Sequence, residues 1–505
     1  MLIDIYFRVR TLGREAKASV CGPTIPHIEL FMSDPAADPH ILALDVGTLS
    51  VRASTYDQLG KVRVAAARPL GLERHSDTEI EQDPQELIGG LKSTLQDVLA
   101  QSAQEGHPIG VAGLSTQRSS VIAWHRQTGE PLSPVLSWQD RRAAHYLERL
   151  SNQAHTIKGR SGLFLSPHYG ASKLRWLYDN CEAVQAAARS GDLQFGPLAA
   201  FVIHHLVEGR PAIVDHVNAS RTQLMDLEQR NWSADLLQRF RLQRPLLPAC
   251  QPTQAFFGCL AGTQIPLQAV NGDQNAAIHG LGKLDEGTFI VNVGTGAFVL
   301  LATGNRPINH PRLLASIANS TPDTATYLLE GTVNGAGAAI KWAEEQWGEQ
   351  NLSQRLEEWL PMVKDPPVFV NTIGGLGSPL WTEGPTPYFN QDGDLAQKSV
   401  AILESIIFLL QINLEMMTNT GQDVRRIRIS GGLSALDGLC QLLADLTQRL
   451  VVRSEVTQAT SRGIAWLAGQ PKYDWSELAN DYFLPRQNRP LQARYRTFCS
   501  LLGWQ

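Results

Sequence analysis

One local pattern occurs twice in this chain, once in each half, and it limits the folds that the chain can adopt. Each copy has an apolar run, a turn built on glycine and threonine, and a second apolar run. The copies consist of Ile41–Asp45, Gly47-Thr48 and Ser50–Tyr56 in the first half, and of Gly287–Val293, Gly294-Thr295-Gly296 and Ala297–Ala302 in the second. Apolar runs of this length bounded by glycine predict strands joined by tight turns. Two halves that open alike predict a duplicated architecture with a cleft between the copies.

The segments between and after these hairpins alternate between strand-like and helix-like patterns. A helix is predicted after Asp83, because Asp83 can cap it, Pro84 suits a first helical position and Glu86 can complete a capping box. Leucines at every fourth position give this helix one buried face: Leu87, Leu91, Leu95 and Leu99. Further strands are predicted at Ile109–Leu114, Val121–Trp124 and Arg426–Ser430, and further helices at Ala338–Glu345, Leu395–Met417 and Leu436–Leu450. This alternation predicts an α/β fold.

Composition limits the classes of function. A chain of 505 residues is too long for one ordinary core, so two or more domains are expected. Its net charge of −5 argues against nucleic acid or an anionic membrane as the main partner. The six cysteines are scattered without a C-x-x-C pair, which predicts reduced, mostly buried thiols. Neither a secretory signal pattern nor an 18-residue apolar run occurs, so we expect a cytoplasmic protein without a membrane span.

The two glycine–threonine turns are candidate phosphate sites. Asp45 ends an apolar run two positions before Gly47-Thr48, so backbone N–H groups and a hydroxyl lie near a carboxylate. That combination suits Mg²⁺ on the acid and phosphate oxygens on the turn. The turn Gly294-Thr295-Gly296 offers the same backbone approach in the second half. Taken singly, each turn is equally compatible with a plain β-hairpin, and the pairing of the two favours a phosphate site.

Asp273 is the candidate general base. It lies on the loop Asn271-Gly272-Asp273-Gln274 after the apolar run Pro266–Val270, where a carboxylate can accept a proton from a hydroxyl. Phosphoryl transfer needs little more than positioning, electrostatics and such a base. The alternative is an Asx-turn or a helix cap, which this composition also favours. Gly431-Gly432 and the Gly335 and Gly337 pair are weaker signals for a ribose or adenine that lies against the backbone.

Ten short segments, taken in order, resemble one family. They are ILALDVGT from Ile41, STQR from Ser115, SWQDRR from Ser137, KLRWLYDN from Lys173, NASRT from Asn218, NGDQNAA from Asn271, VNVGTGAF from Val291, AGAAIKW from Ala336, GGLGSPLW from Gly374 and ISGG from Ile429. In these segments the chain resembles the FGGY family of carbohydrate kinases, and most of all its glycerol kinases. The resemblance runs from about Ile41 to Gly469.

The resemblance implies an actin/hexokinase-type fold, in which two ribonuclease-H-like α/β domains face an interdomain cleft. The implied division is an N-terminal extension at residues 1–38, a substrate-side domain at 39–283 and a nucleotide-side domain at 284–505. Asp273 would be the catalytic base, and Asp45 with Asp273 would hold Mg²⁺. ATP would bind through Gly47, Thr48, Gly294, Thr295, Gly337, Gly431 and Gly432, with Arg52 near the phosphates.

The implied polyol pocket is formed by Arg118, Trp138, Asp273, Gln274 and Phe298. The chain departs from glycerol kinases at two positions of this pocket, with Ser119 in place of a glutamate and His168 in place of a tyrosine. It also has Leu49 in place of a threonine in the phosphate turn, and a shortened segment after Trp381. Because a site built to hydrogen-bond a hydroxyl discriminates strongly, these losses argue against glycerol itself as the acceptor.

Several of these residues have plainer alternatives. Arg118 can be a surface ion-pair partner, and Arg52 can belong to a structural salt bridge. An aromatic before a helix, like Trp138, is usually a core residue, and His168 can be a hydrogen-bonded loop histidine.

The leading functional hypothesis is phosphorylation of a hydroxyl of a small polyol or sugar by ATP with Mg²⁺. An actin-like or chaperone-like ATPase would share the phosphate turns but would not need Trp138, Arg118 or the Asp273-Gln274 pair. A degenerate kinase that acts as a regulatory ligand-binding protein is the third hypothesis, and the retained Asp273 argues against it. A homo-dimer or tetramer is a family expectation.

Overall fold

The computed structural model describes residues 38–504, apart from 283, 286, 457, 472–474 and 476–479. All the elements below belong to one compact unit, Pro35–Gln505. The extension predicted at residues 1–38 therefore lies outside the described residues, except for its last position.

The first lobe contains a five-stranded sheet in the order β14-β6-β1-β2-β3. Its strands are β1 (His40–Val46), β2 (Ser50–Tyr56), β3 (Val62–Pro69), β6 (Ile109–Thr116) and β14 (Leu267–Gly272). The hairpin β1–β2 and the β2–β3 pair are antiparallel, whereas β6 pairs in parallel with both β1 and β14. Every residue of β1 is buried, which explains its continuous apolar run.

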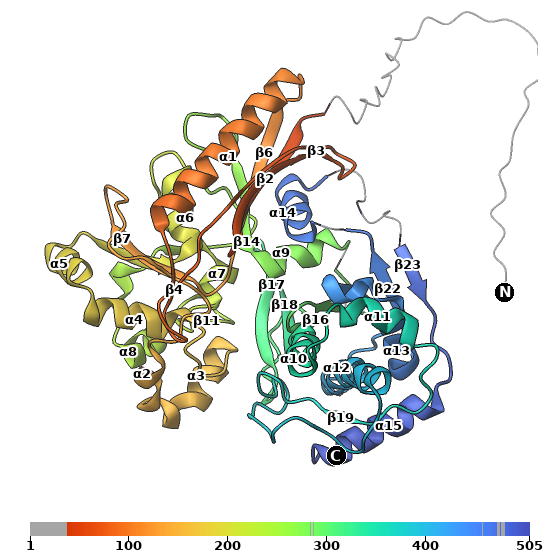
Figure 1. Ribbon diagram of the computed structural model, residues 1–505. Coiled ribbons are helices and arrows are strands. Elements are labelled where there is room, and N and C mark those ends of the chain that lie inside the picture. The colour runs from red at the N-terminus through yellow and green to blue at the C-terminus, as the bar shows by residue number, and fades with distance from the viewer. Residues whose placement is uncertain are drawn as a thin grey trace, which may run out of the picture. The chain divides into compact units, whose positions relative to one another are not determined.

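Helix α1 (Pro84–Gln104) packs on β2 and β3, as Figure 1 shows near the top of the view. Asp83 caps it by accepting the backbone N–H of Gln85, and Pro84 is its first residue, as predicted. The predicted capping box is wrong: Glu86 instead accepts the backbone N–H of Gly71 at 3.0 Å, because the chain before the helix folds back over that carboxylate.

The second lobe contains a seven-stranded sheet in the order β17-β18-β16-β15-β21-β22-β23. Its strands are β15 (Thr288–Val293), β16 (Ala297–Gly304), β17 (Leu314–Ser320), β18 (Ala325–Val333), β21 (Arg426–Ser430), β22 (Leu450–Ser454) and β23 (Asn480–Phe483). Here too an antiparallel hairpin, β15–β16, has an antiparallel neighbour on one side and the parallel strands β21 and β22 on the other. The two sheets share one pairing scheme, which confirms the predicted duplication.

Helix α12 (Leu395–Thr418) is the central helix of the second-lobe core. It is long and apolar enough to cross a membrane, but 89% of its most apolar window is buried inside the protein, as in the core helices of soluble proteins. Two further predicted helices are confirmed, α10 (Gly337–Trp347) and α13 (Asp437–Thr447).

Helix α14 (Ala459–Gly469) comes late in the chain but packs on the first-lobe sheet. Its Ile464 shares a buried cluster with Ile41 and Ala43 of β1, and in Figure 1 the blue α14 lies beside the green α9 (Asp273–Gly280). A Cβ on Gly463 would collide with the carbonyl oxygen of Ala276 in α9, so the two helices touch backbone to backbone. Their close packing gives α9 a fixed position on the sheet.

A smaller five-stranded sheet in the first lobe, in the order β4-β5-β8-β7-β9, supports the loops around the site. The remaining elements are β4 (Glu73–Arg74), β5 (Ile80–Gln82), β7 (Val121–His125), β8 (Val135–Leu136), β9 (Leu193–Pro197), β10 (Ile213–Asp215), β11 (Met225–Asp226), β12 (Asn231–Trp232), β13 (Ala249–Gln251), β19 (Phe369–Val370), β20 (Tyr388–Phe389), α2 (Ala144–Glu148), α3 (Ala154–Ser161), α4 (Gly170–Asn180), α5 (Glu182–Ser190), α6 (Leu198–Leu206), α7 (His216–Ser220), α8 (Ala234–Phe240), α11 (Leu352–Trp359) and α15 (Arg489–Leu501), with short 3₁₀ turns at Ser151–Gln153, Arg244–Leu246 and Gly432–Ala435.

The five cysteines within the described residues are all free, as predicted, but only Cys440 is buried. Cys181, Cys250, Cys259 and Cys499 are half-buried, so the expectation of mostly buried thiols is wrong.

Candidate active site

Asp45 lies at the end of β1, at the edge where the parallel strands of the first sheet finish. Its side chain is buried, and its Oδ1 accepts the hydroxyl of Ser115, the residue beside it on β6, at 2.8 Å. Burial raises the pKa of Asp45 to about 6 against the opposing effect of the Ser115 hydrogen bond, and the negative charge of Asp273 adds to the rise. A buried carboxylate whose pKa is raised by a second carboxylate forms with it a site that a cation would stabilise.

Asp273 is the first residue of α9, directly after Gly272 ends β14. The predicted loop is therefore a strand-to-helix junction, in which Oδ1 accepts the backbone N–H of Gln274 at 2.7 Å. The carboxylate remains 30% exposed, with the Nε of Arg118 3.9 Å from Oδ1. Burial raises the pKa of Asp273, while Arg118 and the N–H of Gln274 oppose that rise.

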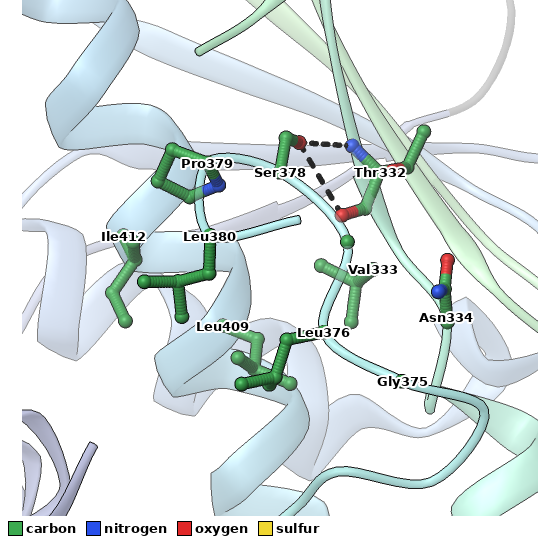
Figure 2. A pocket seen from close by; sticks show the side chains of 11 residues that line it. Thr332, Val333, Asn334, Gly375, Leu376, Ser378, Pro379, Leu380, Leu409 and Ile412 are labelled. Carbon is green, nitrogen blue, oxygen red and sulfur yellow. Dashed lines mark hydrogen bonds between the residues drawn. The ribbon is translucent and has the colours of Figure 1, made fainter. Parts of the chain in front are cut away.

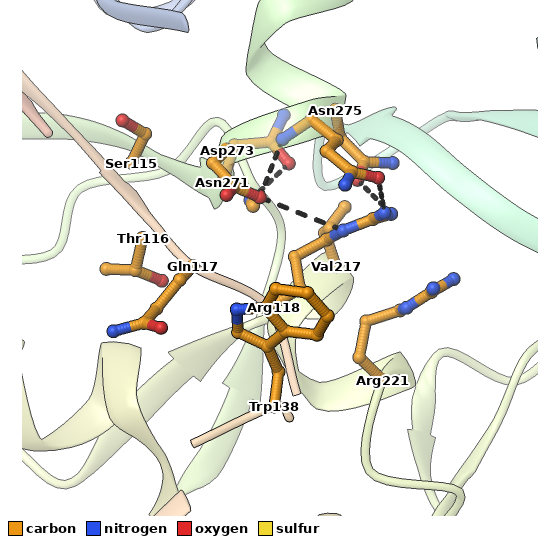
Figure 3. A network of polar contacts seen from close by, with 12 residues as sticks. Ser115, Thr116, Gln117, Arg118, Trp138, Val217, Arg221, Asn271, Asp273 and Asn275 are labelled. Carbon is orange, nitrogen blue, oxygen red and sulfur yellow. Dashed lines mark hydrogen bonds and ion pairs between the residues drawn. The ribbon is translucent and has the colours of Figure 1, made fainter. Parts of the chain in front are cut away.

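Arg118 lies at the centre of the polar network in Figure 3, where its guanidinium points toward Asp273 and Asn275. It donates to the side-chain oxygens of Gln274 and Asn275, the latter at 2.8 Å, and to Glu330 Oε1 at 3.3 Å. Only 8% of Arg118 is exposed, so a surface ion pair is the wrong interpretation of this residue. The arginine connects the start of α9 to the second lobe, because Glu330 belongs to β18.

Glu330 itself binds two arginines of the first lobe. Its Oε2 accepts Arg221 Nη1 at 3.0 Å, in addition to the Arg118 bond, and Ser316 donates to Oε1 at 2.6 Å. Although burial alone would raise the pKa of Glu330, the charges of Arg221 and Arg118 lower it to about 2. The buried carboxylate is therefore ionised and joins the two lobes.

Trp138 lies between residues predicted for the acceptor and residues predicted for the phosphates. Its indole Nε1 donates to Thr48 Oγ1 at 3.0 Å, and the Thr48 hydroxyl donates to Gln117 Oε1 at 3.2 Å. Its ring meets His168 edge to face, with centroids 5.7 Å apart. Trp138 is 36% exposed, so its interpretation as a core aromatic is wrong. An exposed indole flanked by Thr48 and His168 can cover the carbon face of a small ligand.

Ser119 and His168 complete the wall next to Trp138. Ser119 has a left-handed backbone, with φ of 65°, and its buried hydroxyl has no hydrogen-bond partner within the described part of the chain. Burial, followed by the charges of Lys173 and Arg221, holds the pKa of His168 well below its usual value. His168 is therefore neutral, and both side chains can exchange hydrogen bonds with an uncharged hydroxyl.

Three glycine segments meet at the end of β15 in the second lobe. Gly294 closes its turn by donating to the carbonyl of Gly296 at 2.8 Å, and α10 begins against that turn, with the Gly337 N–H 2.9 Å from the Gly294 carbonyl oxygen. A Cβ on Gly337 would lie 2.7 Å from the same oxygen. At Gly431, where φ is 96°, a Cβ would lie 2.6 Å from the Val293 carbonyl oxygen. The convergence of these segments creates a surface of half-buried glycine backbone beside the exposed Thr295.

The remaining predicted residues occupy distinct places. Gly47 closes the first-lobe turn by donating to the Ser50 carbonyl at 3.0 Å, and Arg52 stands opposite Asp45 on β2 with an exposed side chain. No salt bridge of Arg52 occurs among the described residues, which leaves its structural alternative unsupported. Gly432 faces open space. Phe298 is half-buried on β16, opposite Thr332, and in the described structure its ring does not contact Trp138.

Several residues near the site were not predicted, among them Ser115, Arg221, Lys173 and Glu330. Ser115, Arg221 and Lys173 lie inside the segments that resemble the family, but nothing in those segments indicates a partner. A role for Glu330 could have been predicted from the sequence, because a lone glutamate in the apolar run Ala325–Val333 must be paired if it is buried.

One small pocket lies away from these residues, and Figure 2 shows it between the end of β18 and α12. Ser378 joins its walls by accepting the Thr332 N–H at 2.6 Å and donating to Asn413 Oδ1 at 2.6 Å. Its lining is Thr332, Val333, Asn334, Gly375, Leu376, Gly377, Ser378, Pro379, Leu380, Leu409 and Ile412. No predicted site residue lines this pocket, but it borders the second-lobe turn, because a Cβ on Gly296 would lie 3.0 Å from the carbonyl oxygen of Val333.

Two family models match the chain. The N-terminal domain of the FGGY family of carbohydrate kinases matches residues 40–280, and the C-terminal domain matches residues 290–470. A glycerol kinase of Citrifermentans bemidjiense is 34% identical over 481 residues, which cover 92% of this chain and 97% of the relative. A glycerol kinase of Burkholderia ambifaria is 30% identical over 484 residues, which cover 93% and 97%.

Solved structures share the fold. Plasmodium falciparum glycerol kinase with ADP has a TM-score of 0.86 at 22% identity, covering 92% of this chain and 99% of that chain. A ligand-bound xylulose kinase from Lactobacillus acidophilus has a TM-score of 0.80 at 20% identity, covering 92% and 98%. At these identities the likeness shows the fold alone, and the predicted two-domain, actin/hexokinase-type α/β fold is confirmed.

Proposed function

Since the chain belongs to the FGGY family of carbohydrate kinases, we propose that it phosphorylates a hydroxyl of a small polyol or sugar with ATP, and that Asp273 activates this hydroxyl. The observation that carries the proposal is the position of Asp273. It begins α9 with a partly exposed carboxylate, next to the buried Asp45 and within 3.9 Å of Arg118.

Asp273 fits the role of general base. Its carboxylate has a raised pKa, which strengthens it as a base, and the charge of Arg118 opposes that rise. The acceptor hydroxyl gives its proton to Asp273 as its oxygen bonds to the terminal phosphorus of ATP. The bond from that phosphorus to the bridging oxygen breaks, and the products are ADP and a phosphate monoester.

The acceptor would lie against Trp138, with Ser119 and His168 beside it. The free hydroxyl of Ser119 and the neutral imidazole of His168 would exchange hydrogen bonds with further hydroxyls of the acceptor. Arg118 and Gln274 bond to each other, so their contribution would be to hold the wall next to Asp273. Phe298 would reach this pocket from the second lobe.

ATP would bind along the turns of both lobes. Gly294 and Gly337 would let the backbone come close to phosphate oxygens, although their own N–H groups bind the carbonyls of Gly296 and Gly294. Thr295, between them and the start of α10, would offer its hydroxyl. Gly47, Thr48 and Arg52 would face the phosphates from the first lobe. Gly431 and Gly432 leave backbone open for the ribose and adenine, because Gly432 has no neighbour near the position that a Cβ would occupy.

The two carboxylates fit a Mg²⁺ ion. Asp45 has one oxygen held by Ser115, and its raised pKa reflects both burial and the charge of Asp273, which a cation would relieve. No group of three or more metal-ligating side chains occurs among the described residues, and Mg²⁺ bound with ATP usually keeps waters and phosphate oxygens as its other ligands. Asp45 and Asp273 would hold the ion, which would neutralise charge on the transferring phosphoryl group.

A panel of acceptors tests the proposal. Purified protein is mixed with ATP, Mg²⁺ and one acceptor at a time, from glycerol through four- and five-carbon polyols to ketoses, and ADP release is followed by a coupled assay. We expect at least one acceptor to stimulate ADP release, with glycerol not the preferred one, because of Ser119 and His168. If every acceptor leaves the rate at that of ATP alone, the kinase proposal is wrong. The predicted homo-dimer or tetramer and the cytoplasmic location stay predictions.

A further inference from the structure

Lys173 is a fully buried lysine in the first turn of α4, next to the proposed acceptor pocket. Its ammonium nitrogen donates three hydrogen bonds, and all three go to backbone carbonyl oxygens. The distances are 3.2 Å to Ser119, 2.7 Å to Ser137 and 3.0 Å to His168. An ammonium group has three N–H donors, so its capacity is completely used.

The three carbonyls come from three separate segments of the chain. Ser119 follows β6, Ser137 follows β8 and directly precedes Trp138, and His168 lies in the turn before α4. Each segment carries one side chain of the acceptor wall: Ser119, Trp138 or His168. One side chain therefore connects the backbones of all three.

The position is an unfavourable one for a cation. The N-terminal turn of a helix carries partial positive charge, and a buried ammonium loses its hydration. In the described part of the chain no carboxylate lies within ion-pair distance of the Lys173 nitrogen. An apolar side chain would occupy this volume without that cost, so the lysine is best explained by the carbonyls that it holds.

We propose that Lys173 is a positioning residue of the acceptor pocket, which sets the relative places of Ser119, Trp138 and His168 through their backbones. This inference rests on the proposed kinase function. Lys173 does not touch the acceptor, so its loss acts on acceptor binding and alignment, and it has no contact with the nucleotide turn of the second lobe.

Three carbonyls need all three N–H donors of the Lys173 ammonium, so the position of the acceptor wall should depend on pH. Burial lowers the pKa of Lys173 to about 7, while Asp140 opposes the shift and Arg142 and Arg141 add to it. Asp140, Arg141 and Arg142 follow Trp138 in the chain. The side chain of His168, whose carbonyl also binds Lys173, is neutral. A deprotonated amine has two N–H donors for three carbonyls. Acceptor binding should therefore weaken as pH rises above about 7, whereas ATP binding should not respond to this group.

The test compares Lys173→Met with a matched control, Arg126→Met. Arg126 also binds two backbone carbonyls of the first lobe, those of Leu193 at 3.0 Å and Pro245 at 2.7 Å, away from the acceptor wall. With the best acceptor of the panel, Lys173→Met should raise the acceptor KM on the order of tenfold to a hundredfold, as a misplaced binding wall does. The KM for ATP should change less than about twofold, and Arg126→Met should change neither constant.

The pH profile separates positioning from a merely structural role. In the wild type the acceptor KM should rise between pH 6.5 and 8.5, and in Lys173→Met this rise should be absent. If Lys173→Met fails to fold, Lys173→Gln, which keeps two N–H donors, serves in its place. An unchanged acceptor KM in either folded variant, or a parallel rise in the KM values of acceptor and ATP, overturns the inference. A wild type without acceptor-stimulated turnover refutes the kinase function instead.

Discussion

At the scale of single residues, the carboxylate of Asp273 is subject to two opposing effects on its pKa. Burial strengthens it as a base, and Arg118, close to its Oδ1, favours the ionised form. Arg118 in turn is held by Asn275 and Glu330, so it cannot swing fully onto the carboxylate. The base is thus available to a hydroxyl rather than locked in an ion pair.

Asp273→Asn should abolish most turnover. Asparagine keeps the volume and the bond to the Gln274 N–H but cannot accept the proton, so kcat should fall by about 10²–10⁴. ATP affinity, measured by calorimetry, should stay within about twofold. The matched control is Asp226→Asn, another aspartate that accepts backbone N–H groups of its own turn. Near-normal kcat in Asp273→Asn would exclude this residue as the base.

Ser119→Gly should separate stability from function. A non-glycine residue at φ of 65° is strained, so glycine should raise the free energy of unfolding by about 1 kcal/mol. The same change removes a free hydroxyl of the acceptor wall and should raise the acceptor KM several-fold. Denaturant unfolding and steady-state kinetics measure the two effects. A gain in stability with unchanged acceptor KM would show that the hydroxyl does not bind the acceptor.

The sequence predicted the functional residues at the ends of strands, but it did not predict the side chains that bind them. Asp45 and Asp273 are recognisable because each follows an apolar run and lies within two positions of a glycine. Their partners Ser115 and Arg118 lie about 70 and 155 positions away along the chain, and only the pairing of β6 with β1 and β14 brings them close. Lys173 was missed for the same reason, since its three carbonyls become neighbours only after folding.

At the scale of elements, the crossing of α9 and α14 positions the catalytic residue. Because α9 begins at Asp273 and its backbone rests on α14, a shift between these helices would move the carboxylate. Strands were well predicted, since β2 and β21 have the predicted bounds. The crossing was not predicted, because close helix contact depends on glycines whose partners lie about 190 residues apart.

Gly463→Ala should loosen this crossing. Its new methyl group would collide with the Ala276 carbonyl, a backbone atom that cannot rotate away, so unfolding free energy should fall by about 1–3 kcal/mol. The kcat should fall as well, because α9 carries Asp273.

The control for this prediction is Gly89→Ala. Gly89 lies in α1, is exposed and has no atom within 4 Å of the position that a Cβ would occupy. Its replacement should raise the free energy of unfolding by about 0.5–1 kcal/mol through helix propensity and leave kcat unchanged. Equal thermal stability and kcat in Gly463→Ala and wild type would contradict the proposed role of the crossing.

At the scale of the whole molecule, Glu330 joins the lobes at the acceptor site. It is buried on β18 and ionised, with Arg118 and Arg221 of the first lobe as its partners. The duplication was predictable from the sequence, because both hairpins are local. This contact was not, because it joins residues more than 100 positions apart.

Glu330→Gln should weaken the association of the lobes. Two buried arginines would lose their shared counter-charge, which should cost about 3–5 kcal/mol of unfolding free energy. Glu404→Gln is the control, since Glu404 is a buried partner of Arg494 within the second lobe. Only Glu330→Gln should enlarge the particle in small-angle scattering with ATP and acceptor bound. Identical profiles for both variants would refute the proposed connection.

The stability that Glu330→Gln loses relative to the wild type should depend on pH. The pKa of Glu330 is lowered to about 2, below its ordinary value near 4.3, so its ion pairs stabilise the folded state above about pH 4. The stability difference between wild type and Glu330→Gln should be constant from pH 8 to about 5. It should shrink as pH falls below about 4 toward 2. A difference that grows with acidification would contradict this assignment.

The late position of α14 has a consequence for synthesis on the ribosome. When the first 280 or so residues have emerged, the face of β1 that carries Ile41 and Ala43 has no cover, because Ile464 and its neighbours have not yet been translated. A nascent chain at that stage exposes an apolar surface of its earliest sheet. A fragment cut at residue 280 should therefore aggregate when expressed alone, and co-expression of the remaining residues should recover it.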